Sequence, residues 1–520
     1  MYNHALSDMV PRLTYQLQSD SLYGACYDAA ILYKGILLST QTEFKKIVMD
    51  SGNRQLINDY GELEKNKAAL THLYDTSASS LPLEADSIET VCTEEERAIM
   101  EKSALYGDFT KTMTYRWRDV QQALKAKDTA IEFLNFHCGG DSVMYAALVL
   151  NKHTDCPKMI PLALKRDFDR YAANMYSGDT CRQMYNLVWK QLEPYMSDTG
   201  DVYFSPSGMF YQTNIEAFRD SSGRMASEKY HLYRVSSTRE ICYGRNEKRP
   251  QTAALYGNID YFMGTEEMAA AARRYHTSGE ENVAMRGLAV DSTDTRGPLK
   301  PLEGTEKEVE NIADELNKGH IHVALVTGKD GTEESFKDLS GKHTGIIHLA
   351  THGFFFNDQK AKDNTFINRL MMNDDRSAVD MSMKRAGLAF AGANNAWSGN
   401  QLPAHTDDGI LLAEEIPDID LRGCDLLVLS ACETGLGDVT SEGVFGLQRG
   451  FKQAGVKTIV MSLWNVKDVA SQKFMSLFYH NLMSGQTKRQ AFIDAQKSLR
   501  DSSEFGDPKD WAAFIMLDGI

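Results

Sequence analysis

The stretch Asp425-Leu426-Leu427-Val428-Leu429-Ser430-Ala431-Cys432-Glu433-Thr434-Gly435 decides the fold of this 520-residue chain. Its apolar run stops abruptly at small and polar residues, which is the pattern of a strand covered on both faces in a parallel sheet. A second stretch, Gly345-Ile346-Ile347-His348-Leu349-Ala350-Thr351-His352-Gly353, has the same form. Chemistry in open α/β sheets collects at the carboxyl ends of the strands. One strand end here offers an imidazole, and the other offers a thiol.

A cysteine nucleophile needs a base close in space to become a thiolate. Cys432 taken alone would more often be a buried structural thiol. Its place beyond a strand, in a turn of small and polar residues, favours a nucleophile. His352 precedes Gly353, which lets a substrate backbone approach closely. His348 lies inside the apolar run, and we expect it in the core.

Taken together, these stretches resemble the CHAT family of caspase-like cysteine peptidases, which are relatives of caspases and separase. The resemblance is carried by Thr351-His352-Gly353, by Ser430-Ala431-Cys432-Glu433-Thr434-Gly435, and by residues 385–394, 442–451, 461–468 and 511–514. Weaker similarity at residues 202–208 and 304–309 extends it over roughly residues 130–520. Caspases themselves have Gln-Ala-Cys and a His about 50 residues upstream. Ser430 and the wider His–Cys spacing therefore agree with the CHAT family.

This resemblance implies a caspase-like three-layer α/β fold with a mostly parallel sheet, in which an inactive caspase-like half precedes the catalytic half. It implies a cysteine endopeptidase with a His352/Cys432 dyad, and the N–H groups of Gly353 and Cys432 as the oxyanion hole. A dyad suffices in caspase-like enzymes, so no third catalytic residue is needed. In separase-like relatives an acid near Asp468 contacts a basic P1 side chain. Alternatively, Asp468 caps a helix expected over residues 469–483.

Helical periodicity predominates before residue 127, and we expect helices over residues 27–38, 55–74, 87–106 and 117–125. No repeat of roughly 34 residues is found in this region. It is therefore either a remnant or edge of a helical-repeat array or a plain helical collar. Extended patterning begins near residue 130, with a hairpin around Gly139-Gly140. From residue 305 helices and strands alternate, which predicts a parallel sheet. We divide the chain into a helical region (1–127), an inactive half (128–330) and a catalytic half (331–520).

Composition narrows the classes of function. A hydrophobic content of 42% and a charged content of 25% are those of a globular protein. The net charge of −16 disfavours nucleic-acid binding. The eight cysteines are scattered, and no targeting signal or membrane span is evident, which fits a reducing cytoplasm. His137-Cys138 and His153-x-x-Cys156 match no standard zinc spacing, so we expect neither metal nor cofactor.

Three functions are compatible with these features. The first is a regulated intracellular endopeptidase, which by family analogy serves a prokaryotic defence or cell-death pathway. It would cut a protein or peptide substrate and receive an activating protein partner through the N-terminal helices. The second is a protein-binding scaffold with a vestigial peptidase domain, and an intact His352/Cys432 pair argues against it. The third is a cysteine hydrolase of small acyl substrates.

Overall fold

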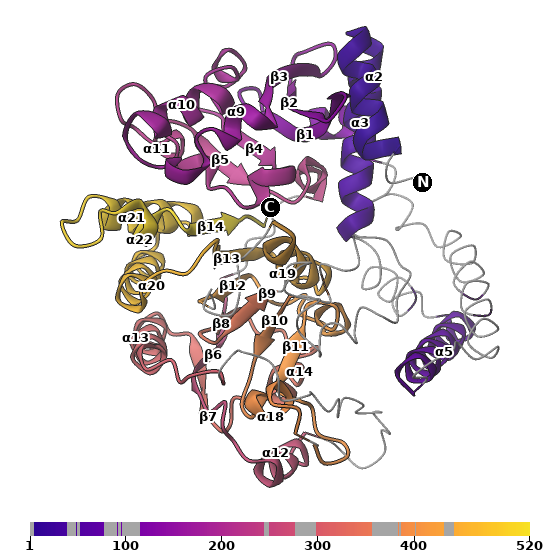
Figure 1. The fold of residues 1–520 in the computed structure, drawn as a ribbon, viewed down its shortest axis with the longest axis vertical. Coiled ribbons are helices and arrows are strands. Elements are labelled where there is room, and N and C mark those ends of the chain that lie inside the picture. The colour runs from indigo at the N-terminus through magenta and orange to yellow at the C-terminus, as the bar shows by residue number, and fades with distance from the viewer. Residues whose placement is uncertain are drawn as a thin grey trace.

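The computed structural model describes residues 5–38, 48, 53–76, 91, 95, 115–243, 249–275, 298–355, 383, 386–400, 402–430 and 441–519. Its centre is an 11-stranded sheet of order β3-β2-β1-β4-β5-β14-β13-β12-β8-β6-β7 (Figure 1). The strands are β1 (Thr129–Gly139), β2 (Ser142–Asn151), β3 (Lys158–Leu164), β4 (Asp201–Ser205), β5 (His231–Arg234), β6 (Thr252–Ile259), β7 (His322–Gly328), β8 (Ile346–Leu349), β12 (Leu426–Leu429), β13 (Thr458–Ser462) and β14 (Phe514–Leu517). Neighbours are parallel except in the β1–β2–β3 meander and between β13 and β14. The expected mostly parallel α/β sheet is confirmed.

Strand β12 shows why its sequence reads as a continuous apolar run. Leu426 and Val428 face one hydrophobic core, whereas Leu427 and Leu429 face another, so both faces of the strand are covered. Helices of the first core include α10 (Gly178–Val188), α13 (Gly304–Lys318), α20 (Asp468–Met483) and α21 (Lys488–Arg500). The second core includes α12 (Thr265–Ala272), α14 (Glu333–Lys337) and α19 (Ser441–Gln453). The sheet therefore forms the middle of three layers.

The sheet runs without a break through both halves of the chain. Strand β14, close to the C-terminus, pairs antiparallel with β13 and parallel with β5 (Figure 1). It thereby joins a first group of strands, β1 to β5, to a second group formed by β6, β7, β8, β12 and β13. Strands β6 and β7 continue the sheet beyond β8. The division of the chain at residue 330 stays a prediction.

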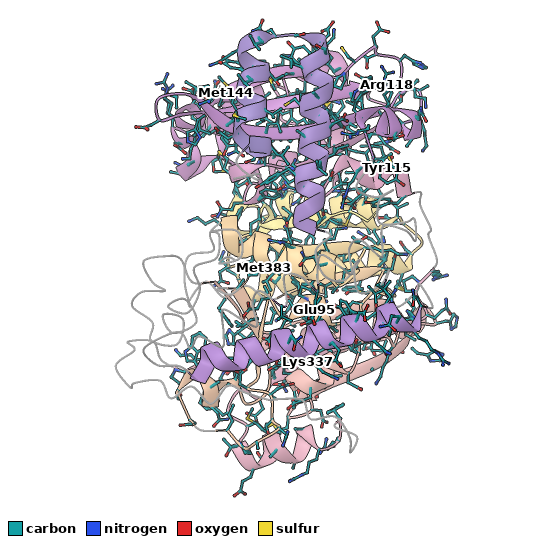
Figure 2. All side chains as sticks on the ribbon, turned by 90° about the vertical axis from the view of Figure 1, so that its right-hand side faces the viewer. Glu95, Tyr115, Arg118, Met144, Lys337 and Met383 are labelled. Atoms are coloured by element: carbon teal, nitrogen blue, oxygen red, sulfur yellow. The ribbon has the colours of Figure 1, made fainter. Side chains whose placement is uncertain are left out.

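N-terminal helices pack against the first group of strands. They include α2 (Val10–Leu17), α3 (Asp20–Leu38) and α8 (Trp117–Ala123), while α5 (Arg54–Thr76) follows α3 along the chain. In the view of Figure 2, α3 stands in front of the strands near Met144, and its Tyr27 and Ile31 share a core with Leu148. The helix expected over residues 87–106 lies almost wholly outside the described residues. These helices confirm the helical character of the described N-terminal segments.

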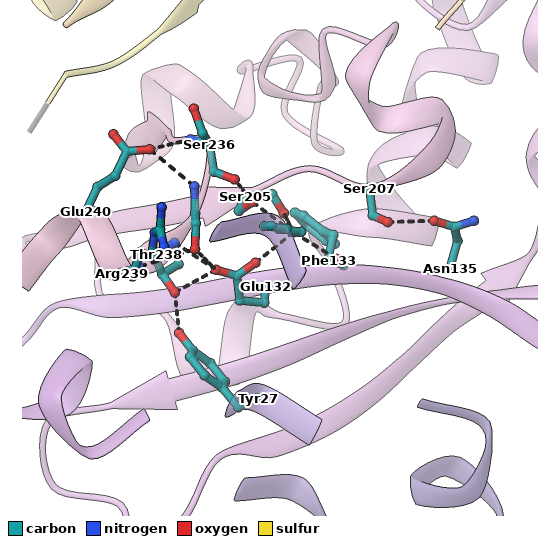
Figure 3. A network of polar contacts seen from close by, with 12 residues as sticks. Tyr27, Glu132, Phe133, Asn135, Ser205, Ser207, Ser236, Thr238, Arg239 and Glu240 are labelled. Carbon is teal, nitrogen blue, oxygen red and sulfur yellow. Dashed lines mark hydrogen bonds and ion pairs between the residues drawn. The ribbon is translucent and has the colours of Figure 1, made fainter. Parts of the chain in front are cut away.

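A buried ion pair fastens α3 to the sheet. Lys34 Nζ lies 2.7 Å from Glu132 Oε2 and 2.8 Å from Ser205 Oγ. The other carboxylate oxygen, Glu132 Oε1, accepts hydrogen bonds from the Thr238 backbone N–H and hydroxyl, each at 2.7 Å. Figure 3 shows Glu132 at the centre of this network, with Tyr27 of α3 bonded to Thr238. A charged residue of the N-terminal helices is thus part of the interior of the α/β domain.

Some elements escaped the sequence-based prediction. Strand β3 contains Pro161, which argues against a central strand but is tolerated at the sheet edge where β3 lies. Between His352 and β12, the described residues include strand β10 (Ala386–Ala389), followed by helix α18 (Ala393–Trp397). Strand β10 forms a small antiparallel sheet with β9 (Gly353–Phe355) and β11 (Ile410–Leu412).

Candidate active site

The two strands singled out from the sequence are direct neighbours. Strands β8 and β12 pair in parallel with Leu349 opposite Leu429, so their carboxyl ends lie at the same edge of the sheet. His352 follows three residues after Leu349. Cys432 follows three residues after Leu429, but it lies outside the described residues, as does Glu433. The structure therefore describes the histidine side of the predicted dyad, and the dyad itself stays a prediction.

The ring of His352 is buried and held by a backbone carbonyl. Its Nε2 lies 2.7 Å from the oxygen of Lys300, and the residue has 0% exposure. Because a carbonyl oxygen can only accept, Nε2 carries the proton, and Nδ1 is the basic nitrogen of the neutral ring. Lys300 lies in the segment that leads into α13. Sequence reasoning did not find this residue, since the group it contributes is a backbone atom.

Tyr261, just beyond β6, forms a second support for His352. The two ring centroids are 4.8 Å apart, and the Tyr261 hydroxyl accepts a 3.2 Å hydrogen bond from the His352 backbone N–H. The same hydroxyl lies 2.9 Å from Thr351 Oγ1, and Thr351 donates in turn to the Ala389 carbonyl of β10. Three chain segments that are remote in sequence therefore meet around the histidine.

Gly353 opens strand β9 and stands opposite Leu388 of β10. The Ala389 N–H donates to the His352 carbonyl at 2.9 Å, which makes that pair a hydrogen-bonded one. Pairs alternate along an antiparallel ladder, so Leu388 and Gly353 form a pair without mutual hydrogen bonds. The Gly353 N–H accordingly points away from β10. This orientation is compatible with its predicted part in an oxyanion hole.

Asp468 is the first residue of α20, beyond the carboxyl end of β13, and its side chain is exposed. The cap position belongs to Lys467, so Asp468 stands in the first turn, where a negative charge also stabilises a helix. A Cβ atom added to Gly304 would lie 3.4 Å from Asp468 Cβ. Asp468 therefore borders the segment from Lys300 to Gly304, whose first residue binds His352. Within the described residues, no hydrogen bond or ion pair engages its carboxylate.

Two residues close to the candidate site in sequence, Cys424 and Trp464, have structural rather than chemical surroundings. Cys424, directly before β12, is fully enclosed, and burial raises the pKa of its thiol to about 12. A thiol of this kind is a poor nucleophile at neutral pH. Trp464 donates from Nε1 to the Lys509 carbonyl at 3.0 Å, and its ring lies 5.6 Å from that of Tyr176. Trp464 thus packs between elements of the first core.

His348 is in the core, as expected, but it is not isolated there. Its Nε2 lies 3.0 Å from Glu308 Oε1 on α13, and its Nδ1 lies 3.2 Å from the hydroxyl of Tyr479 on α20. Burial, with the nearby Glu308 carboxylate, raises the pKa of Tyr479 well above its usual value. This buried trio ties together β8, which leads to His352, α13, which follows Lys300, and α20, which begins at Asp468.

Among the described residues, no cluster of three or more His, Cys, Asp or Glu side chains is arranged to hold a metal ion. No described helix is both long enough and apolar enough to cross a bilayer.

Comparison with known proteins gives three findings. A family model described as CHAT domain matches residues 178–519, more than half of the chain. Tetratricopeptide repeat protein 28 from Homo sapiens is 33% identical over 108 residues, and its Mus musculus counterpart is 32% identical; each match covers 21% of this chain. The chain spans only 4% of the length of these curated relatives. A chain of the Saccharomyces cerevisiae separase–securin complex aligns with a TM-score of 0.37 and 8% identity, over 95% of this chain and 37% of that chain.

Proposed function

Because the chain belongs to the CHAT domain family, we propose that it is a cysteine endopeptidase with His352 and Cys432 as its catalytic dyad. The parallel register of β8 and β12 carries this proposal, since both residues stand three positions beyond the paired Leu349 and Leu429. From Ser430, the last described residue of that segment, the chain extends at most about 7 Å to Cys432. This short reach supports the pairing of Cys432 with His352.

Each group has a defined task in the proposed reaction. His352 Nδ1 takes the proton of the Cys432 thiol, and the thiolate attacks the carbonyl carbon of the scissile peptide bond. The N–H groups of Gly353 and Cys432 donate to the oxyanion that forms. The imidazolium then protonates the leaving amine, and the carbon–nitrogen bond breaks. Water, deprotonated by His352, attacks the thioester, which releases the acid product and restores the thiol–imidazole pair.

The Lys300 carbonyl suits this sequence of proton transfers. It accepts a hydrogen bond from Nε2–H in both the neutral ring and the imidazolium, so the ring need not rotate when it gains a proton at Nδ1. A charge-assisted hydrogen bond is roughly twice as strong as a neutral one, and the bond therefore tightens as the imidazolium forms. This change favours the charged intermediate state.

We further propose that Asp468 favours a basic residue at P1 of a protein or peptide substrate. An exposed carboxylate without a partner among the described residues, at the border of the Lys300–Gly304 segment, can bind a lysine or arginine side chain. The wider role that family analogy suggests is a regulated cytoplasmic peptidase in a prokaryotic defence or cell-death pathway. An activating protein partner would engage the N-terminal helices, which the buried Lys34–Glu132 pair couples to the sheet.

A second candidate is a protein-binding scaffold whose peptidase domain is vestigial. The similarity to a tetratricopeptide repeat protein favours it. The two candidates differ in the reactivity of one thiol, because a scaffold has no need of a Cys432 that is activated by His352.

The decisive experiment treats the full chain with a covalent cysteine-directed peptide probe that carries Arg at P1, followed by mass mapping. We expect an adduct on Cys432 that His352→Ala strongly slows. Cys432→Ala and His352→Ala should each lower hydrolysis of a fluorogenic peptide by at least about 10³-fold, in the range seen when a nucleophile or its base is removed. Cys424→Ala is the matched control and should stay within about twofold of wild type, since its thiol is buried and protonated. An inactive Cys424 variant with an active Cys432 variant would refute the assignment, and an unlabelled Cys432 would favour the scaffold.

A further inference from the structure

The segment Pro298-Leu299-Lys300-Pro301-Leu302-Glu303 carries the carbonyl that holds His352, yet it belongs to neither a helix nor a strand. Its two prolines have no N–H, so the segment has few backbone donors with which to fasten itself. The residue before a proline is also restricted to extended conformations, and this restriction applies to Lys300. Something outside the segment must hold the Lys300 carbonyl at 2.7 Å from Nε2.

The side chain of Asn394, on α18, provides this attachment. Its Nδ2 donates to the Leu299 carbonyl at 3.0 Å, and its Oδ1 accepts from the Leu299 N–H at 2.8 Å. One amide side chain thus pairs with both polar groups of a single backbone residue, as a neighbouring strand would. Asn394 is 6% exposed and Leu299 is 1% exposed, so water does not compete for these bonds.

The backbone of Asn394 reaches the other support of the histidine. Its N–H donates to the Tyr261 carbonyl at 3.1 Å, and the ring of Tyr261 packs against that of His352. Asn394 therefore connects the two supports of His352, because its side chain binds Leu299, the neighbour of Lys300, and its main chain binds Tyr261. It also ends the 385–394 stretch, to which the sequence assigned no chemical role.

We propose that Asn394 is a positioning residue for His352, acting through Leu299 on the Lys300 carbonyl. This inference rests on the proposed function, because it treats His352 as the general base. The Leu299–Lys300 peptide unit is rigid, and Lys300 has restricted dihedral angles because it precedes Pro301, so a shift of Leu299 is passed on to the carbonyl that accepts the hydrogen bond from Nε2–H. Hydrogen bonds weaken steeply as the donor angle departs from linearity, and the tautomer with a basic Nδ1 then loses its support.

The substitution Asn394→Asp gives the sharpest test. A protonated carboxyl has one donor and one acceptor and can reproduce both bonds to Leu299, whereas a carboxylate can only accept and would face the Leu299 carbonyl. Burial raises the pKa of a carboxyl group, so the change between the two forms occurs well above pH 4. The kcat/KM of this variant, divided by that of wild type at each pH, should therefore fall at least tenfold from pH 5 to pH 8. We expect the loss in kcat, with KM within about twofold.

Asn395 offers a matched control one residue further along α18. Its Nδ2 donates to the carbonyls of Met263 and Gly392, at 2.8 and 2.9 Å, and makes no hydrogen bond to the described segment at Leu299. Asn395→Asp should give a kcat/KM ratio that does not vary with pH by more than about twofold. A similar fall for the Asn394 and Asn395 variants would mean that both act only by holding α18 in place, and would overturn the proposal.

A second readout does not depend on catalysis. The full chain is labelled with ¹⁵N-histidine for nuclear magnetic resonance. The Nε2–H signal of His352 is the one that is present in the wild-type spectrum and absent from the spectrum of the His352→Gln variant. Its exchange with water should be at least tenfold faster in Asn394→Ala than in Asn395→Ala.

If the wild type hydrolyses no peptide but this difference appears, the proposed function fails and the positioning role stands. If the exchange rate is unchanged and the Asn394→Asp ratio does not vary with pH, the positioning role is wrong even in an active enzyme. Should Asn394→Ala fail to fold, Asn394→Asp provides both measurements, at pH 5 and pH 8.

Discussion

Replacing Lys34 by methionine should be among the most destabilising single changes outside the candidate site. The ammonium group of Lys34 is buried, and burial lowers its pKa although the Glu132 carboxylate acts in the opposite direction. Besides Glu132 Oε2 and Ser205 Oγ, Nζ reaches the carbonyls of Phe133 and Ser205, both at 3.2 Å. Methionine fills most of the same space but leaves these acceptors without their donor.

The magnitude follows from what remains after the change. Glu132 keeps its bonds from Thr238 but loses its counter-ion inside the protein, and removing one partner of a buried pair costs about 3–5 kcal/mol. Adding Glu132→Gln to Lys34→Met removes the unpaired charge while retaining an acceptor for the Thr238 N–H. The double variant should therefore be more stable than the sum of the single effects by about 1–3 kcal/mol.

Urea unfolding of the full chain, followed by circular dichroism, measures these differences. Lys65→Met is the control, because Lys65 pairs with Glu62 at 2.9 Å but is 73% exposed, and it should cost less than about 0.5 kcal/mol. A Lys34→Met variant within about 1 kcal/mol of wild type, or no coupling with Glu132→Gln, would refute the reasoning. Either result would mean that α3 is not fastened to the sheet through this pair.

Two further predictions concern charged side chains. Asp468→Asn should lower kcat/KM at least tenfold for peptides with Arg or Lys at P1 and leave Leu peptides unchanged, whereas a wild-type preference for Leu, Met or Asp in a P1-varied panel would remove Asp468 from the site. Burial alone would raise the pKa of Glu193, but hydrogen bonds from Lys190, Lys229 and Tyr185 outweigh it and lower the pKa to about 2. A lowered pKa stabilises the fold above the ordinary value near 4.5 and loses that effect as pH falls toward 2. Glu193→Gln should thus cost about 2 kcal/mol at pH 7 in urea unfolding and almost nothing near pH 2, and a cost independent of pH would contradict this account.

The sequence predicted those parts of the fold in which one strand or helix is recognisable by itself. The run Leu426–Leu429 is apolar at every position because both faces of β12 are covered, and α20 spans the helix expected over residues 469–483. Strand β14 has only four residues, and its partners β13 and β5 lie far away in the chain. Length is not the obstacle, because β12 is equally short; the place of β14 between β13 and β5 depends on pairing with distant strands, which no local pattern shows.

The candidate site divides along a different line, between groups that do chemistry and groups that hold them in place. A general base must be a particular side chain, so His352 could be proposed for this role from the residues around it. The partner that sets its tautomer is the carbonyl of Lys300, a group that every residue possesses. The residue that holds this carbonyl, Asn394, is 95 positions from the Leu299 backbone it binds. The chemistry of a side chain can be read from the sequence, whereas the position of a backbone carbonyl is known only from the fold. Mutations chosen from sequence motifs in this chain would therefore test His352 and leave its proposed support by Lys300 and Asn394 untested.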